Sequence, residues 1–310
     1  MIGLASSLLV AGCAAPAVVT RDAKRDPFEG GIGGTGIVGT LTELGSLRIN
    51  GLLAETTPRT RVVNALGPVG QGALAPGQSL TVFAERTPEA LMARHVRIDY
   101  PLVGTLQEIG TQLFVNGVRV VPEPGAAGRL AVGRRVAVSG LWSGERVVAS
   151  RVDPAPFDLD LVAGDVVRGP DNALRVGGVV LEQRGARSFP TSGSYAIAAG
   201  RYADGSLAAQ RLASGRFAFG ASSLRQLAVE GYLEPTAAAP GFRIAGLGHS
   251  FSDDLRLSQL AARRAIFAGP YDEVFAATAG YVVPEDASAR RRVLLDGYDG
   301  ALGDGAVSTG

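Results

Sequence analysis

The sequence has few of the residues on which catalytic and metal sites are usually built. Its 310 residues include one cysteine, two histidines and one tryptophan, and aromatic residues make up only 6% of the chain. The single cysteine, Cys13, excludes an internal disulfide. The histidines, His95 and His249, lie at unrelated places in the sequence, so a histidine-rich metal site is not expected. No G-x-S-x-G motif is present to supply the nucleophile of a Ser-His-Asp site.

The chain also lacks an excess of charge and a long apolar segment. Its net charge is +1, which is not the electrostatic signature of a nucleic-acid-binding protein. No run approaches the roughly 18 apolar residues that a transmembrane helix needs. Hydrophobic residues nevertheless make up 46% of the sequence, and 43 glycines accompany 17 prolines. This composition is that of a folded protein in which many turns join short strands.

The N-terminal sequence "MIGLASSLLVAGCAAP" carries the strongest local signal. A short apolar run ends in small residues directly before Cys13, as in a secretory signal peptide. We therefore expect residues 1–12 to be a signal peptide. The small, polar and charged residues 13–29 predict a tether to a folded body. An ordinary buried cysteine in an N-terminal helix is the alternative interpretation.

The glycine-rich segment "GGIGGTG" follows the tether. It contains a formal G-x-G-x-x-G match at Gly31, Gly33 and Gly36. A dinucleotide-binding site needs a strand before this motif and a helix after it. Here a tether precedes the motif and a β-like segment follows it. We therefore expect a flexible or tightly turned lead into the first strand, and no bound cofactor.

A short hairpin pattern recurs four times. Asn-Gly and Gly-Gly suit a two-residue hairpin turn, because both turn positions need positive φ. The second copy predicts that Leu113 pairs with Val120 and that Val115 pairs with Val118 on one apolar face. In the fourth copy Ala245 disfavours positive φ, so a different turn is expected. The copies are "LRINGLLA" from Leu47, "LFVNGVRV" from Leu113, "LRVGGVVL" from Leu174 and "FRIAGLGH" from Phe242.

Related segments around these hairpins define four units. Gly140, Gly200 and Gly269 recur at intervals of about sixty to seventy residues. Each unit contains about five short strands, which can close into a small barrel without exposed edges. We predict an all-β fold of tandem five-stranded barrels, OB-like or SH3-like, with a shared-strand β-sandwich or solenoid as the alternative. The predicted units are repeats at 30–99, 100–154, 155–213 and, in divergent form, 214–280, followed by a C-terminal tail at 281–310.

Two groups of side chains are candidates for a site. Trp142, Tyr202 and Tyr271 each stand two places after a repeat glycine, so they are candidates for packing between repeats or for ligand contact. Asp158, Asp160 and Asp165 form an acidic stretch. Paired carboxylates can hydrolyse glycosides or bind calcium, but solvent-facing strand residues are the commoner case.

The sequence also resembles a known family. The segment "GGIGGTGIVGTL" followed by "LGSLRINGLLAE", behind a lipobox-like cysteine, is similar to bacterial envelope lipoproteins with tandem copies of a domain of unknown function. The resemblance implies that Cys13 is acylated and anchors the protein. Because Ala14 rather than an aspartate follows the cysteine, it also implies the periplasmic face of the outer membrane. It supplies no activity, cofactor or catalytic residue.

These observations predict a non-enzymatic envelope lipoprotein whose repeats act as scaffold or protein-interaction modules. The alternative is a binding module for an envelope glycan or peptide. The expected partners are the membrane, reached through the lipid anchor, and an envelope protein or glycan. Nucleic acid is not an expected partner.

Overall fold

The computed structural model describes residues 18–20, 34–183, 190–218, 223–235, 242–248, 250–251, 257 and 260–296. Several predictions lie outside the described residues. They concern the signal peptide, Cys13, most of the tether, Gly31, Gly33, His249 and the last part of the C-terminal tail.

The described chain is all-β apart from one 3₁₀ turn, one α-helix and isolated helical turns, as the sequence predicts. Residues 102–154 show the plan of each repeat. The first strand pairs with the second, the second with the third, and the fourth with both the fifth and the first. The third strand pairs in parallel with the fifth, which closes the ring. The result is an OB-like barrel, here called barrel 2. Its strands are β9 (Leu102–Ile109), β10 (Gln112–Val115), β11 (Val118–Gly128), β12 (Arg135–Ser143) and β13 (Arg146–Pro154).

Barrels 1 and 3 close in the same order. In each, the third and fifth strands again pair in parallel. Barrel 1 consists of β2 (Gly34–Glu43), β3 (Leu47–Ile49), β4 (Leu52–Glu55), β7 (Ser79–Arg86) and β8 (Leu91–Asp99), and a further hairpin of β5 (Arg61–Asn64) and β6 (Gly67–Val69) lies beside β8, followed by the 3₁₀ turn Gln71–Ala73. Barrel 3 consists of β14 (Asp160–Arg168), β15 (Leu174–Val176), β16 (Val179–Gln183), β17 (Tyr195–Ala203) and β18 (Ser206–Ser214).

Barrel 4 is the divergent copy that the sequence predicts. Its third strand again pairs in parallel with its fifth. Its hairpin turn also differs from the others, because Gly246 has positive φ and Ala245 does not. Its strands are β19 (Leu224–Pro235), β20 (Phe242–Ile244), β21 (Ser250–Phe251), β22 (Arg264–Asp272) and β23 (Val274–Ala276). The sheet continues through β24 (Ala279–Val282) to β1 (Val18–Thr20), three residues of the predicted tether.

The hairpin pattern folds in the predicted register. Leu113 pairs with Val120 and Val115 with Val118. Asn116 and Gly117 both have positive φ, as a two-residue turn requires. Val115, Val118 and Val120 are buried in the core of barrel 2. Local turn chemistry and alternation of apolar residues therefore define this element completely.

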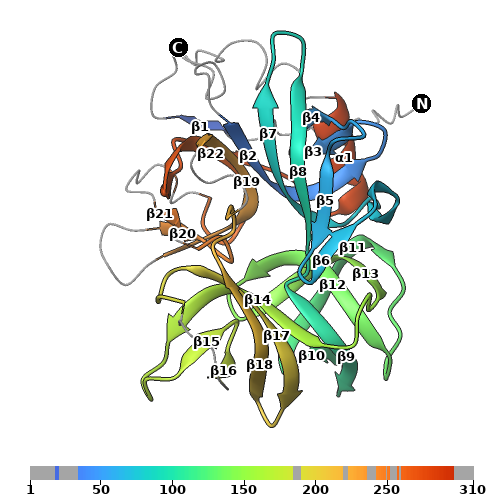
Figure 1. Ribbon diagram of the computed structural model, residues 1–310, viewed down its shortest axis with the longest axis vertical. Coiled ribbons are helices and arrows are strands. Elements are labelled where there is room, and N and C mark those ends of the chain that lie inside the picture. The colour runs from blue at the N-terminus through green and yellow to red at the C-terminus, as the bar shows by residue number, and fades with distance from the viewer. Residues whose placement is uncertain are drawn as a thin grey trace, which may run out of the picture.

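The barrels are joined in pairs through their first strands. β2 runs parallel to β19, which joins barrels 1 and 4. β9 runs antiparallel to β14, which joins barrels 2 and 3. Barrels 1 and 4 occupy the upper half of Figure 1 and barrels 2 and 3 the lower half. The described residues thus form the predicted small barrels, and each pair of barrels is joined into one continuous sheet without sharing a strand.

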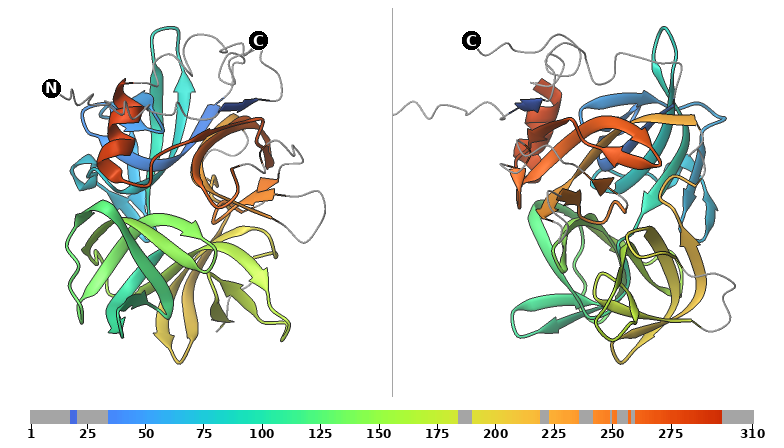
Figure 2. Two further views of the ribbon diagram at one scale, coloured as in Figure 1. Left: turned by 180° about the vertical axis from the view of Figure 1, so that it is seen from behind. Right: turned by 90° about the vertical axis from the view of Figure 1, so that its left-hand side faces the viewer.

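A single α-helix lies on the outside of this arrangement. α1 (Ala287–Asp296) belongs to the segment predicted as a tail, and Figure 2 shows it beside barrel 1 and above barrel 2. The first turn of α1 approaches Gly125 of β11. The guanidinium Nη2 of Arg291 lies 3.8 Å from the carboxylate Oε1 of Glu43 in β2. No helix in the described part of the chain is long and apolar enough to cross a membrane.

Candidate functional site

Trp142 occupies the junction of three barrels. β12 carries a bulge at Gly140, where a Cβ atom would overlap the backbone of β13. Two residues later the indole of Trp142 is only 5% exposed, and its Nε1 donates a hydrogen bond of 2.8 Å to the carbonyl of Ala163 in barrel 3. The ring also lies against Gly177 of barrel 3 and Gly246 of barrel 4. Trp142 therefore fills space between barrels.

Two asparagine side chains also lie between barrels, and they connect the barrels by hydrogen bonds. The Nδ2 of Asn116 donates to the carbonyls of Val103 in its own barrel and Leu161 in barrel 3, at 2.9 and 3.0 Å. A Cβ atom on Gly104 would overlap this amide, so the strand needs glycine there. Each asparagine thus connects the first strands of two barrels.

Barrel 1 repeats this arrangement. The Nδ2 of Asn50 donates to the carbonyls of Val38 and Ala228 at 2.9 and 3.1 Å, and Gly39 leaves room for the amide. In barrel 3 the turn has Gly177 in place of asparagine, and Trp142 occupies that space. Asn50 thus links barrels 1 and 4, Asn116 links barrels 2 and 3, and Trp142 of barrel 2 lies at the corresponding turn of barrel 3.

A buried charged cluster lies beside this junction. Asp99 accepts from Arg97 at 2.7 Å, from Thr81 at 2.5 Å and from Arg216 at 3.1 Å. The guanidinium of Arg216 lies 4.3 Å from the ring centre of Tyr195, a cation–π contact. Burial, the main cause, raises the pKa of Tyr195, so its hydroxyl stays neutral. Barrels 1 and 3 contribute these groups together with the segment that leads into barrel 4.

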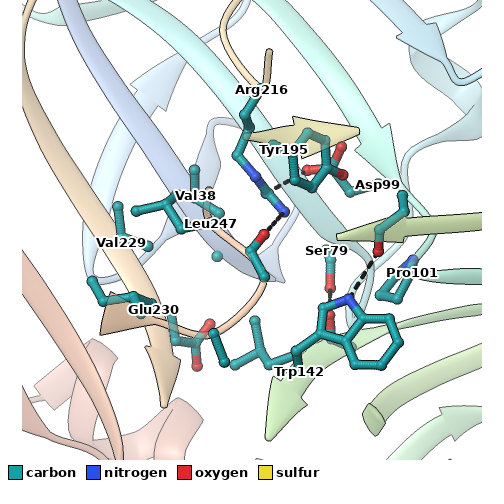
Figure 3. Close-up of a pocket in the computed structure, with 17 residues that line it drawn as sticks. Val38, Ser79, Asp99, Pro101, Trp142, Tyr195, Arg216, Val229, Glu230 and Leu247 are labelled. Carbon is teal, nitrogen blue, oxygen red and sulfur yellow. Dashed lines mark hydrogen bonds and ion pairs between the residues drawn. The ribbon is translucent and has the colours of Figure 1, made fainter. Parts of the chain in front are cut away.

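The space left at the junction is small. A cavity of about 20 Å³ is lined by Trp142, Asp99, Tyr195 and Arg216, whose side chains converge in Figure 3. A second cavity, of about 60 Å³, shares Tyr195, Arg216 and Leu247 with it. Since a water molecule needs roughly 10–15 Å³ by this measure, these cavities have room for ordered water rather than an organic substrate.

Asp165 fastens barrel 3 to barrel 4. Its two carboxylate oxygens accept from the backbone N–H groups of Gly246 at 3.0 Å and Gly248 at 2.5 Å. Burial raises the pKa of Asp165, although these hydrogen bonds and the nearby Arg243 and Arg216 act against the increase. The carboxylate therefore holds the hairpin turn of barrel 4 in place.

A second buried network joins α1 to barrels 1, 2 and 4. Arg264 bonds to Glu230 at 2.8 Å and to Glu123, and Arg290 bonds to Glu123 at 2.5 Å. The backbone N–H of Thr40 donates to Glu230 at 2.7 Å. All four charged side chains are at most 3% exposed, and their charges balance. We call Arg264, Arg290, Glu123 and Glu230 the ion quartet.

The predicted aromatic candidates do not gather at one surface. Trp142 lies at the junction described above. The hydroxyl of Tyr202 lies over Gly117, in the hairpin turn of barrel 2. Tyr271 packs edge-on against Phe217, with ring centres 5.7 Å apart. Each ring contacts a segment outside its own hairpin, and whether any of them also contacts a ligand stays a prediction.

The predicted acidic group is dispersed. Asp158 is exposed. Asp160 binds Arg135 at 2.6 Å and accepts from the backbone of Tyr202 at 2.9 Å. Asp165 binds barrel 4 instead. Among the described residues no group of three or more His, Cys, Asp or Glu side chains is placed to hold a metal ion.

Of the two histidines, the structure describes His95. His95 lies on β8 with its ring 6.3 Å from that of Phe83. Burial, with a smaller contribution from Arg61, lowers its pKa. His249 lies outside the described residues.

Sequence reasoning missed the ion quartet and the role of Asn50 and Asn116. The asparagines were predicted only as turn formers. Their burial depends on carbonyls from another barrel, which no local pattern reveals. The one usable signal was the recurrence of Gly39 and Gly104 before the two Asn-Gly turns.

Comparison with protein-family models, curated proteins and solved structures gives no match.

Proposed function

We propose that the protein is a non-enzymatic lipoprotein of the bacterial envelope whose four barrels act as one rigid scaffold for other envelope components. One observation carries this proposal. The surfaces between barrels hold buried polar groups that bond from one barrel to the next: the asparagine bridges, the Trp142 contact and the ion quartet. Because separating such groups exposes unpaired partners, the barrels resist moving relative to one another.

The sequence supports the lipid anchor, and β1 gives it a geometric consequence. β1 begins at Val18 and pairs with β24, five residues after Cys13. Five residues span at most about 18 Å, since a fully extended chain advances no more than about 3.6 Å per residue. An acylated Cys13 would therefore hold the β1 end of the body close to the membrane surface.

Cys13→Ser tests the anchor. We expect the native protein, produced in a Gram-negative host, to fractionate with membranes and to carry acyl mass on its N-terminal peptide. The Cys13→Ser protein should be unmodified and lose membrane association, since no acylated cysteine remains. A Cys13→Ser protein that stays in the membrane fraction would contradict the proposal.

Chemical cross-linking in intact membranes tests the scaffold. We expect the native protein to capture a reproducible set of envelope components. A variant with a loosened body, Arg290→Met, should lose them while retaining its anchor. Equal capture by the Arg290→Met protein would show that partner binding does not need the rigid arrangement. The surface control is Arg291→Met, which changes a 54% exposed neighbour on the same helix.

A further inference from the structure

The outer face of barrel 2 carries a row of side chains that its fold does not use. Strand register places Gln107 beside Phe114, Phe114 beside Arg119, and Arg119 beside Arg146. Their neighbours along the strands, such as Val115 and Val118, point into the core, so alternation directs the row outward. Three strand spacings of about 4.8 Å make this row roughly 14 Å long. We call these four residues the barrel 2 row.

The two arginines of the row are exposed, and no carboxylate of the described structure is paired with either of them. Arg119 and Arg146 face each other on parallel strands. Within the described structure neither forms an ion pair or a side-chain hydrogen bond. Glu145 is exposed in the adjoining turn and is not paired with them. Like charges directly opposite each other destabilise a sheet, so this arrangement gives no stability to the barrel itself.

The other three barrels neutralise the corresponding face. At the register position of Phe114 they carry Arg48, Arg175 and Arg243. Each of these arginines is paired with a carboxylate of its own barrel: Arg48 with Glu43 at 3.5 Å, Arg175 with Asp171 at 2.6 Å and Arg243 with Glu234 at 3.2 Å. Barrel 2 alone has an aromatic ring there, followed by two free guanidinium groups. This difference marks the barrel 2 row as a surface for something other than folding.

We propose that the barrel 2 row binds an anionic glycan, a sugar chain that carries carboxylate or phosphate groups. Neighbouring guanidinium groups can bind such groups bidentately. The half-buried Phe114 offers a ring face on which a sugar ring can pack. Gln107 supplies amide donors and acceptors at one end of the row. Ile109, 63% exposed, extends the apolar surface along β9.

The closed barrel favours a glycan over a peptide. Extended peptides commonly bind by adding a strand to a free sheet edge. Every strand of barrel 2 has a partner on each side over part of its length, so the barrel offers no strand with a wholly free edge. A ligand of this face must bind through side chains alone. Barrel 2 lies in the lower half of Figure 1 and β1 in the upper half, and the proposal does not depend on acylation of Cys13.

Titration of the full chain in detergent with labelled oligosaccharides tests the proposal. The probes are an oligomer of galacturonic acid, a phosphorylated mannan oligomer and an uncharged maltose oligomer of the same length. We expect at least one anionic oligomer to bind, the uncharged one to bind far more weakly, and added salt to weaken binding. In Arg119→Gln/Arg146→Gln the affinity should fall by about tenfold or more, because two charge-assisted contacts are lost. Phe114→Ala alone should also lower the affinity, because the ring face on which a sugar can pack is lost.

The matched control removes the same charge elsewhere. Arg59→Gln/Arg201→Gln changes two exposed arginines of barrels 1 and 3 and should bind like the native protein. All these positions are at the surface or half-buried, so unchanged Trp142 fluorescence confirms folding. The proposal is overturned if neither anionic oligomer binds, if the two double variants behave alike, or if a polyglutamate peptide binds as tightly as the glycan.

Discussion

At the scale of single residues, one side-chain amide determines how two barrels meet. Asn116 is 5% exposed, has positive φ and donates to carbonyls of two barrels. Its place after a β-strand and before Gly117 predicts the hairpin turn. It does not predict the second carbonyl, which comes from Leu161. The turn was therefore predictable from sequence, and the bridge was not.

Asn116→Gly should cost about 2–3 kcal/mol of unfolding free energy. Glycine keeps the turn without strain, so the loss reports two buried carbonyls that lose their donor. The control is Asn172→Gly, at an exposed residue that also has positive φ. Its effect should be within about 0.5 kcal/mol. Urea denaturation measures both, and equal effects would show that the buried bridge contributes nothing.

At the scale of elements, strands were predictable and their partners across barrels were not. Hairpins such as β10–β11 depend on neighbouring residues, so the apolar alternation and the Asn-Gly turn suffice. The pairing of β2 with β19 joins residues nearly two hundred positions apart. α1 was predicted as part of a tail because its buried contacts, such as those of Arg290 with Glu123 and of Leu294 with the core, involve residues far along the chain.

Arg290→Met should destabilise the protein by about 3–5 kcal/mol. Without Arg290, Glu123 and Glu230 share one guanidinium, and a buried carboxylate is left uncompensated. Adding Glu123→Gln restores the charge balance and should recover part of the loss. Arg291→Met, on the exposed side of α1, should change the unfolding free energy by less than about 0.5 kcal/mol. An unfolding free energy of the Arg290→Met protein equal to that of the native protein would show that the ion quartet does not stabilise the fold.

The ion quartet also predicts a dependence on acid. Burial alone would raise the pKa of Glu230, but Arg264, Arg290 and the Thr40 N–H hold it below its ordinary value of 4.5. Its stabilising effect is therefore complete above pH 4.5 and is lost as the pH falls through the lowered pKa.

The stability difference between the native protein and Glu230→Gln tests this dependence. The difference should be largest above pH 4.5 and should narrow at lower pH. The raised pKa of Asp165 acts in the opposite direction in both proteins, so it cancels from the comparison. A difference that stays constant with pH would rule out the contribution from Glu230.

At the scale of the whole molecule, four similar barrels behave as one body in our account. Their first strands join them in pairs, and Trp142, Asp165 and the ion quartet connect the pairs. The fold class and the repeat were predictable from sequence, since each barrel follows its own local pattern. The packing of the four barrels was not, because it depends on side chains with no counterpart in every repeat.

Equilibrium unfolding in urea tests most directly whether the four barrels behave as one body. Trp142 is the only tryptophan, so its fluorescence reports the junction, while far-ultraviolet circular dichroism reports the strands of all four barrels. We predict one transition with the same midpoint and slope for both signals. A fluorescence change that precedes loss of the strands, or separate transitions for separate barrels, would show that the barrels are independent.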